Sequence, residues 1–193
     1  CNLGVTLRET GRSDEAEAYL RRALEIRPAF AEAHINLGAL LHAGKRFAEA
    51  EASYRQGLRS QPENAEVLSN LGATLKEMGR FDEAEGCFRR ALQIRPDIVE
   101  TLLNLGSVLQ DLGRLVEGQE ICRQALALRP DFAGAHNHMG SALQAQGRLV
   151  EAVELRQEVE RRLQDPVLGA RRATVEVQRD ADRLRITITD EGP

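Results

Sequence analysis

The chain has 193 residues with a formal net charge of −4, and 42% of its residues are apolar. This length suits one ordinary soluble domain that can bury a core of its own. Aromatic residues make up only 4% and Trp is absent, which argues against aromatic-rich β-sandwiches and against nucleic-acid binders that stack bases. The mild acidity predicts no attraction to nucleic acid or to anionic membranes, and no apolar run approaches the roughly 20 residues of a membrane span. A soluble helical protein is the first expectation.

The cysteines indicate where the protein is located, and the first residue predicts that the protein is longer than this chain. Cys1, Cys87 and Cys122 are too few and too odd in number for a disulfide framework, so we expect reduced thiols and a cytoplasmic location. The chain begins at Cys1 with no basic and apolar leader before it. We therefore expect a piece of a longer protein. Of the 26 Lys and Arg residues only Lys45 and Lys76 are Lys, which points to a GC-rich, bacterial genome.

A period of 34 residues organises the sequence. Glycines recur at this interval, and so do prolines: Gly4, Gly38, Gly72, Gly106 and Gly140, with Pro28, Pro62, Pro96 and Pro130. Two residue types keeping the same period indicate a structural repeat rather than a compositional accident. In chain order the predicted repeats are residues 1–30, 31–64, 65–98, 99–132 and 133–166.

Each repeat reads as two helices joined by a tight turn. In residues 65–98, Leu68, Leu71 and Leu75 share one helix face, and Phe88 lies on the apolar face of the next helix. Gly79 lies between the two helices, where its tolerance of positive φ suits a helix end. The small residues Gly72 and Ala84 predict a close approach of the two helices where they cross.

The fifth repeat and the tail depart from this pattern. In the fifth repeat Arg156 stands where Tyr54 and Phe88 stand in earlier repeats, as expected for the end of a stack. In residues 167–193 apolar and polar residues alternate over 174–178 and 184–189, which predicts a β-hairpin with a loop over 179–183. The hairpin either covers the end of the last helix pair or opens a truncated domain.

With these residues in view, the chain resembles the tetratricopeptide repeat (TPR) family over residues 1–166. The resemblance implies an all-α fold, a right-handed α-solenoid of stacked helix-turn-helix repeats, with the short β-hairpin-like tail appended. It also implies that the first helix of each repeat lines a concave groove.

The candidate peptide-binding residues are those that flank the Leu-Gly pairs of the first helices. They form two series: Asn2, Asn36, Asn70, Asn104 and His138, with Asn137 beside it, and then Arg8, His42, Lys76 and Gln110 one turn beyond the glycine. A primary amide can both donate to and accept from a peptide backbone, so regular Asn spacing suits an extended segment. The alternative is that Asn recurs here only as a habit of the family. Glu32, Glu66 and Glu100 near the helix starts are explained by helix N-termini alone.

Two further resemblances lead to alternative functions. The Asn series is similar to the repeat arm of O-linked N-acetylglucosamine transferases, which would make the chain the part that presents protein substrates to a glycosyltransferase domain. The tail, with Asp190 near its end, resembles the strands before the first Gly box of histidine-kinase-type ATPase domains, which would place the repeats in a signalling protein. Neither catalytic domain is contained in these 193 residues.

Other chemistry is set aside. His34 and His136 stand where leucines stand in other repeats, so we expect core packing, and His136 and His138 point about 200° apart on a helix, which does not suit a shared metal. Cys87 and Cys122 read as buried, inert thiols, and the repeated Arg-Glu pairs as a solvated face. The sequence thus predicts a non-enzymatic scaffold for a protein or peptide partner, with no metal, no cofactor, no nucleic acid and no membrane.

Overall fold

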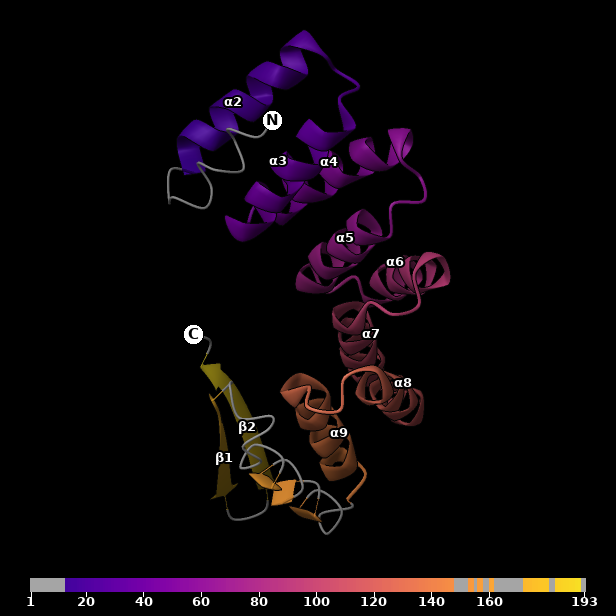
Figure 1. Cartoon of the computed structure of the whole chain (residues 1–193), viewed down its shortest axis with the longest axis vertical. Coiled ribbons are helices and arrows are strands. Elements are labelled where there is room, and N and C mark those ends of the chain that lie inside the picture. Colours follow the sequence, from indigo (N-terminus) through magenta and orange to yellow (C-terminus); the bar gives the residue numbers. More distant parts are fainter. Residues whose placement is uncertain are drawn as a thin grey trace. The chain divides into compact units, whose positions relative to one another are not determined.

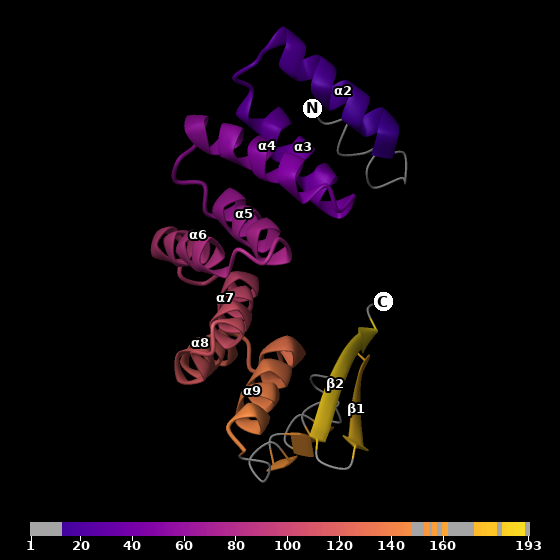
Figure 2. The ribbon, with the colours of Figure 1, turned by 180° about the vertical axis from the view of Figure 1, so that it is seen from behind.

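The computed structural model describes residues 13–147, 153–154, 156–157, 160–161, 172–180 and 183–191. It has helices and a pair of strands in the order that Figures 1 and 2 show from opposite sides. The elements are α2 (Ser13–Ile26), α3 (Ala31–Ala43), α4 (Phe47–Ser60), α5 (Ala65–Glu77), α6 (Phe81–Ile94), α7 (Val99–Asp111), α8 (Leu115–Leu128), α9 (Ala133–Ala145), β1 (Arg172–Asp180) and β2 (Arg183–Glu191). The predicted helical repeat fold is confirmed.

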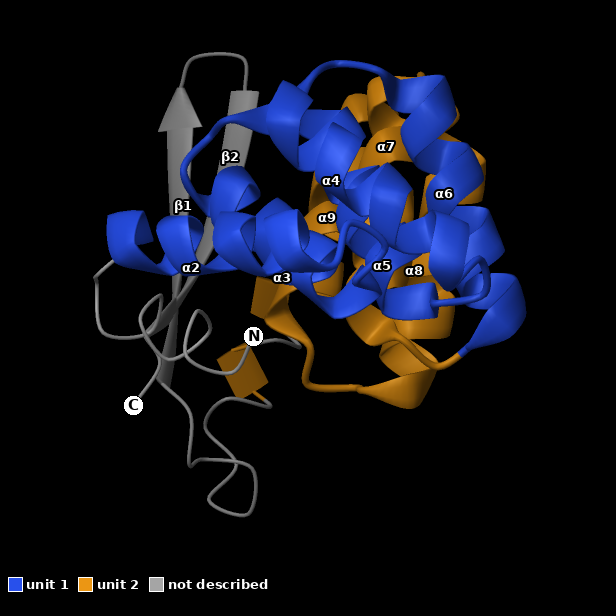
Figure 3. Ribbon diagram, turned by 90° about the horizontal axis from the view of Figure 1, so that it is seen from above, with its two compact units in different colours: residues 1–96 blue, residues 97–193 orange. Residues whose placement is uncertain are grey.

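The chain divides into two compact units, which are coloured separately in Figure 3: unit 1 is Cys1–Pro96 and unit 2 is Asp97–Pro193. In unit 1 α3 packs against α4, and α5 packs against α6; in unit 2 α7 packs against α8. Each of these pairs falls within one 34-residue interval of the sequence. No helix of the described residues is both long enough and apolar enough to cross a membrane.

The turns inside the pairs confirm the expected role of glycine. Gly79, Gly113 and Gly147 have φ of +72°, +75° and +72°, a region that glycine enters without the steric cost of a Cβ. The equivalent residue after α3 is Lys45, which adopts φ of +59°. The 34-residue period therefore imposes a backbone conformation at this place even where the sequence has no glycine.

The close approach of paired helices is also confirmed, with one addition. A Cβ on Gly72 would lie 2.7 Å from Cε1 of Phe88, and a Cβ on Gly38 would lie 2.8 Å from the ring of Tyr54. The ring at this place on the second helix thus lies directly over the glycine of the first helix. Phe88 and Tyr54 are consequently almost fully buried.

A closed ring of four charges joins successive second helices. Glu17 of α2 accepts from Arg46 at 2.7 Å and from Arg21 at 2.7 Å, and Glu49 of α4 accepts from Arg46 at 2.7 Å and from Arg21 at 3.4 Å. Burial raises the pKa of Glu17, but hydrogen bonds from Arg46 and Arg21 outweigh it and leave the pKa below its ordinary value. The pairs thus link neighbouring repeats in addition to meeting solvent.

The same ring recurs one repeat later. Arg80 contacts Glu51 at 2.6 Å and Glu83 at 2.7 Å, and Arg55 contacts Glu51 at 2.8 Å and Glu83 at 3.3 Å. This ring connects α4 to α6. The expectation of a merely solvated face is therefore wrong in one respect, since each carboxylate of these rings also bridges two arginines across a repeat boundary.

The two strands at the C-terminal side form an antiparallel pair in which Val175 is opposite Ile188 and Val177 is opposite Ile186. Both strands are longer than the sequence predicts, because Arg179, Asp180 and Arg183 belong to them. The connecting residues 181 and 182 lie outside the described residues.

Candidate functional site

The first helix of each pair carries a partly exposed polar stripe beside its buried leucines. In α5 the buried face includes Leu68, Leu71 and Leu75, whereas Asn70 and Lys76 are half-buried. The predicted residues Asn36, His42, Asn104, Gln110, Asn137 and His138 are half-buried in the same way on α3, α7 and α9. Asn2 and Arg8 lie outside the described residues.

In unit 1 His42 and Asn70, one from each predicted series, both contact Thr74, a residue that the sequence did not single out. Nδ1 of His42 on α3 lies 3.0 Å from Oγ1 of Thr74 on α5. Thr74 in turn donates its hydroxyl hydrogen to the backbone oxygen of Asn70, at 2.8 Å. His42 and Asn70 therefore share Thr74 as a common neighbour on the stripe.

In unit 2 the corresponding contact joins Gln110 of α7 to His138 of α9. Nε2 of Gln110 donates to the backbone oxygen of His138 at 2.7 Å, and Oε1 of Gln110 lies 3.1 Å from Nδ1 of His138. Gln110 occupies the place of His42 in the repeat. In both units this position thus reaches across to the next first helix.

Three predicted side chains have unused hydrogen-bonding groups. Within the described part of the chain, the amides of Asn70 and Asn104 and the ammonium of Lys76 have no hydrogen-bond or ion-pair partner. Asn36 and His138 do have partners. Oδ1 of Asn137 is buried without a partner. Asn70 and Asn104 are therefore the predicted residues with a complete amide still available to a ligand.

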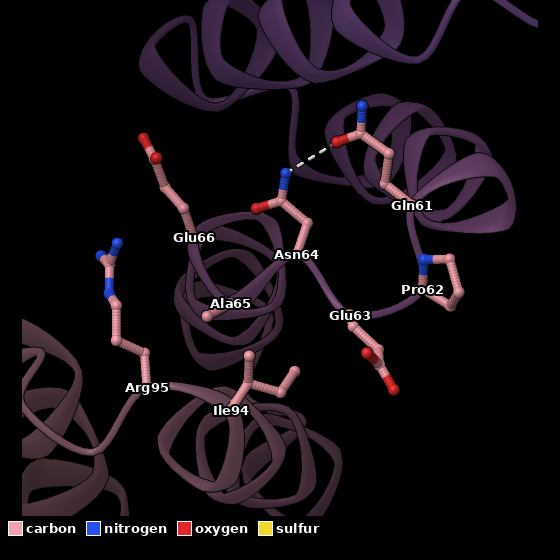
Figure 4. A pocket seen from close by; sticks show the side chains of 8 residues that line it. All are labelled: Gln61, Pro62, Glu63, Asn64, Ala65, Glu66, Ile94 and Arg95. Atoms are coloured by element: carbon pink, nitrogen blue, oxygen red, sulfur yellow. Dashed lines mark hydrogen bonds between the residues drawn. The ribbon is translucent and has the colours of Figure 1, made fainter.

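A pocket of about 590 Å³ in unit 1 was not anticipated from the sequence. It lies between the loop after α4, the start of α5 and the end of α6, and Figure 4 shows the residues that line it: Gln61, Pro62, Glu63, Asn64, Ala65, Glu66, Ile94 and Arg95. Asn64 and Gln61 hold the start of α5. The side chain of Asn64 accepts a hydrogen bond from the backbone N–H of Val67 at 3.1 Å and donates one to Gln61 at 2.8 Å. The only sequence signal for it is the recurrence of Pro62 in the period.

The glutamates at the helix starts are exposed, as helix N-termini alone would explain. Glu32, Glu66 and Glu100 all lie on the surface, and Glu100 pairs with Arg129 at 3.2 Å. The guanidinium of Arg129 also lies 4.8 Å from the ring centroid of Phe132. The contacts of Arg129 therefore fix Glu100 within the fold of unit 2.

His136 and Cys122 are buried as expected, whereas His34 and Cys87 are only half-buried. Nε2 of His34 lies 2.8 Å from the carbonyl oxygen of Pro28, and Nε2 of His136 lies 2.9 Å from that of Pro130. Cys122 is buried, and burial raises the pKa of its thiol to about 11; burial also raises the pKa of the Cys87 thiol. Thiols with raised pKa are poor nucleophiles at neutral pH. Over the residues described, no three His, Cys, Asp or Glu side chains are grouped so as to hold a metal ion.

Comparisons with known structures agree with this fold. The chain is 22% identical to YrrB, described as a TPR protein with an unusual peptide-binding site, with a TM-score of 0.73 over 86% of each chain. It is 21% identical to MamA, with a TM-score of 0.77 over 82% of this chain and 92% of that one. It is 28% identical to PilF of Pseudomonas aeruginosa, with a TM-score of 0.74 over 83% and 73% of the two chains.

Sequence comparisons identify the family. A search of curated proteins found no match. Family models described as tetratricopeptide repeat match residues 1–30, 30–97 and 103–165. Together these ranges cover most of the chain and contain both polar stripes. The chain belongs to the tetratricopeptide repeat family.

Proposed function

We propose that this protein is a non-catalytic scaffold in which the polar stripe on the first helices of each unit binds an extended peptide segment of a partner protein. The observation that carries the proposal is the pair of unused amides, Asn70 in unit 1 and Asn104 in unit 2. A primary amide offers two donors and an acceptor, the complement of a peptide unit, and it reads no side chain. Such a site holds an extended chain with little sequence preference.

The fold and the relatives support the proposal. TPR proteins generally act by binding other proteins, and the similar structure of YrrB is described as having a peptide-binding site. Lys76 adds an unpaired cation to the stripe of unit 1. An anionic side chain close to the segment bound by Asn70 would thus be favoured over a cationic one.

The test uses the full chain and a random library of synthetic peptides. Peptides selected by the wild-type protein are measured against a variant with Asn36→Ala, Asn70→Ala and Asn104→Ala. Each lost hydrogen bond is worth about 1 kcal/mol, so affinity should fall by at least about tenfold. Helicity measured by circular dichroism should stay unchanged, because these side chains are partly exposed.

The matched control replaces exposed amides of the second helices. Gln93→Ala and Gln124→Ala remove amide groups from α6 and α8, away from the stripes. This control should bind the selected peptides as the wild type does. Equal affinity of the triple Asn variant and the wild type would disprove the role of the Asn series.

A further inference from the structure

The hydrogen bonds of the four described histidines fix which ring nitrogen carries the proton when the ring is neutral. For His34 and His136 the partner of Nε2 is a backbone carbonyl, of Pro28 and Pro130 respectively. A carbonyl only accepts, so Nε2 must donate. Both neutral rings are therefore the Nε2–H tautomer.

His42 has the opposite tautomer because its partner has already used its only proton. Thr74 is fully buried, and its hydroxyl donates to the backbone oxygen of Asn70, one helical turn earlier. The oxygen of that hydroxyl can then only accept from Nδ1 of His42, 3.0 Å away. Neutral His42 is consequently the Nδ1–H tautomer, with a lone pair on Nε2.

That lone pair is available on the stripe. Among the described residues no group bonds to Nε2 of His42, and this atom is not one of the buried atoms that lack a partner. The ring of Phe47 packs against that of His42, at 5.4 Å between ring centroids in an edge arrangement. His42 thus presents a fixed acceptor beside Asn70, on the surface that the proposed peptide would occupy.

We propose that Nε2 of His42 accepts a backbone N–H of the bound peptide, next to the peptide unit held by Asn70. This inference rests on the proposed function, and it makes His42 a specificity-determining residue. The segment bound over unit 1 must have an N–H at one defined position, so proline or an N-methylated residue is rejected there.

The position of His42 is occupied differently in unit 2. Gln110 stands at the place of His42, but its Oε1 and its Nε2 are both engaged by His138. The amide oxygen accepts from Nδ1 of His138, because the amide nitrogen already donates to the backbone oxygen of that residue. At the place of His42, unit 2 thus carries an amide that is bonded to His138 and no ring nitrogen.

The first test measures the tautomers directly in the full chain. Long-range proton–nitrogen NMR at about pH 8, where an ordinary histidine is neutral, should show Nδ1–H for His42 and His138 and Nε2–H for His34 and His136. In Thr74→Val the acceptor is lost, so the Nδ1–H preference of His42 should disappear while His138 is unchanged. Finding Nε2–H for His42 in the wild type would overturn the inference.

The second test is an N-methyl scan of a peptide selected from the random library. One N-methyl position should weaken binding to the wild type by about tenfold but change binding to His42→Phe by less than about twofold. Phe keeps the aromatic ring against Phe47 and removes the acceptor. An N-methyl profile that is the same for both proteins overturns the role of His42 while peptide binding itself stands. Failure of the wild type to select any peptide overturns the proposed function, and with it this role, whereas the NMR result is independent of any ligand.

Discussion

The helix pairs α5/α6 and α7/α8 both pack closely at a glycine of the first helix, but different side chains lie over that glycine. In α5/α6 the glycine of the first helix lies under an aromatic ring, with a Cβ on Gly72 only 2.7 Å from Phe88. In α7/α8 the equivalent places hold Gly106 and Cys122, and a Cβ on Gly106 would lie 3.0 Å from Sγ. The Cys122 side chain is smaller than that of Phe88, and α8 also has Gly118 at the place where α6 has Ala84.

Both pairs keep a close crossing of their two helices, although the residues at the crossing differ. A Cβ on Gly118 would lie 3.1 Å from the backbone oxygen of Gly106, so in α7/α8 the backbones themselves come close where α5/α6 inserts a ring. The repeat therefore specifies a close helix crossing, and either a large side chain over one glycine or two facing glycines can provide it. Substitutions at these places should separate the two solutions.

Phe88→Ala should have the largest effect. Its ring is fully buried, so truncation leaves a cavity over Gly72 and should lower the free energy of unfolding by about 3–5 kcal/mol. Urea unfolding followed by circular dichroism measures this. Phe88→Leu is the control and should lose clearly less, since Leu20 fills the equivalent place in the first repeat. Cys122→Ala should also lose less, and a larger loss there than in Phe88→Ala would contradict the comparison.

Gly72→Ala and Gly118→Ala should each lower the free energy of unfolding by about 1–2 kcal/mol, because overpacking outweighs the better helix propensity of Ala. The two losses should differ in how they are rescued. In Gly72→Ala the obstacle is a side chain, so adding Phe88→Leu should recover at least half of the loss. In Gly118→Ala the obstacle is a backbone oxygen, so adding Cys122→Ala should recover none. Equal rescue in both double variants would show that the two crossings are alike.

The turns within the pairs should give smaller effects. Gly79 and Gly113 link α5/α6 and α7/α8 at positive φ, whereas α3/α4 uses Lys45 at φ of +59°. Lys45→Gly should raise the free energy of unfolding by less than about 1 kcal/mol, since relief of backbone strain is partly offset by the flexibility of glycine. Gly113→Lys should lower it. Thermal unfolding measures both, and destabilisation by Lys45→Gly would refute the strain at that turn.

The charge ring of Arg80, Glu51, Arg55 and Glu83 should give the smallest effect at neutral pH, because exposed ion pairs are individually weak. Hydrogen bonds from Arg80 hold the pKa of Glu83 below its ordinary value of 4.5. A carboxylate with a lowered pKa stabilises the fold above its unfolded pKa and loses this contribution as the pH falls through the folded value. The stability difference between wild type and Arg80→Gln should therefore shrink as the pH is lowered from about 6 to below about 4.

The control for this pH dependence is Arg59→Gln, since Arg59 hydrogen-bonds the neutral side chain of Gln56. Its stability difference from the wild type should stay constant over the same range of pH. Urea titrations avoid adding salt, which would screen the ring. A difference for Arg80→Gln that does not change with pH would mean that the ring contributes nothing through Glu83.

The period made most of the fold predictable. Spacing alone located the helix pairs, the positive φ of Gly79 and the close helix crossing at Gly72, because each depends on residues that recur every 34 positions. The charge rings were not predictable, since they depend on distances between side chains of neighbouring repeats. The polar residues of the stripes could be named, but their hydrogen bonds could not. Thr74 sits at a position that holds Leu40 and Val108 in the neighbouring repeats, so the period gives no reason to expect its contact with His42, and without that contact the tautomer of His42 is undetermined.

The central claim is that a peptide lies on the polar stripes of the first helices, and photo-crosslinking tests it most directly. A benzophenone amino acid replaces Ala73, which is half-buried on the stripe of α5 between Asn70 and Lys76. A matched protein carries it at Gly86 of α6, where a side chain would meet open space. With a peptide selected from the random library, crosslinks should form from position 73 and not from position 86. Crosslinks from position 86 alone, or equally from both, would contradict the account.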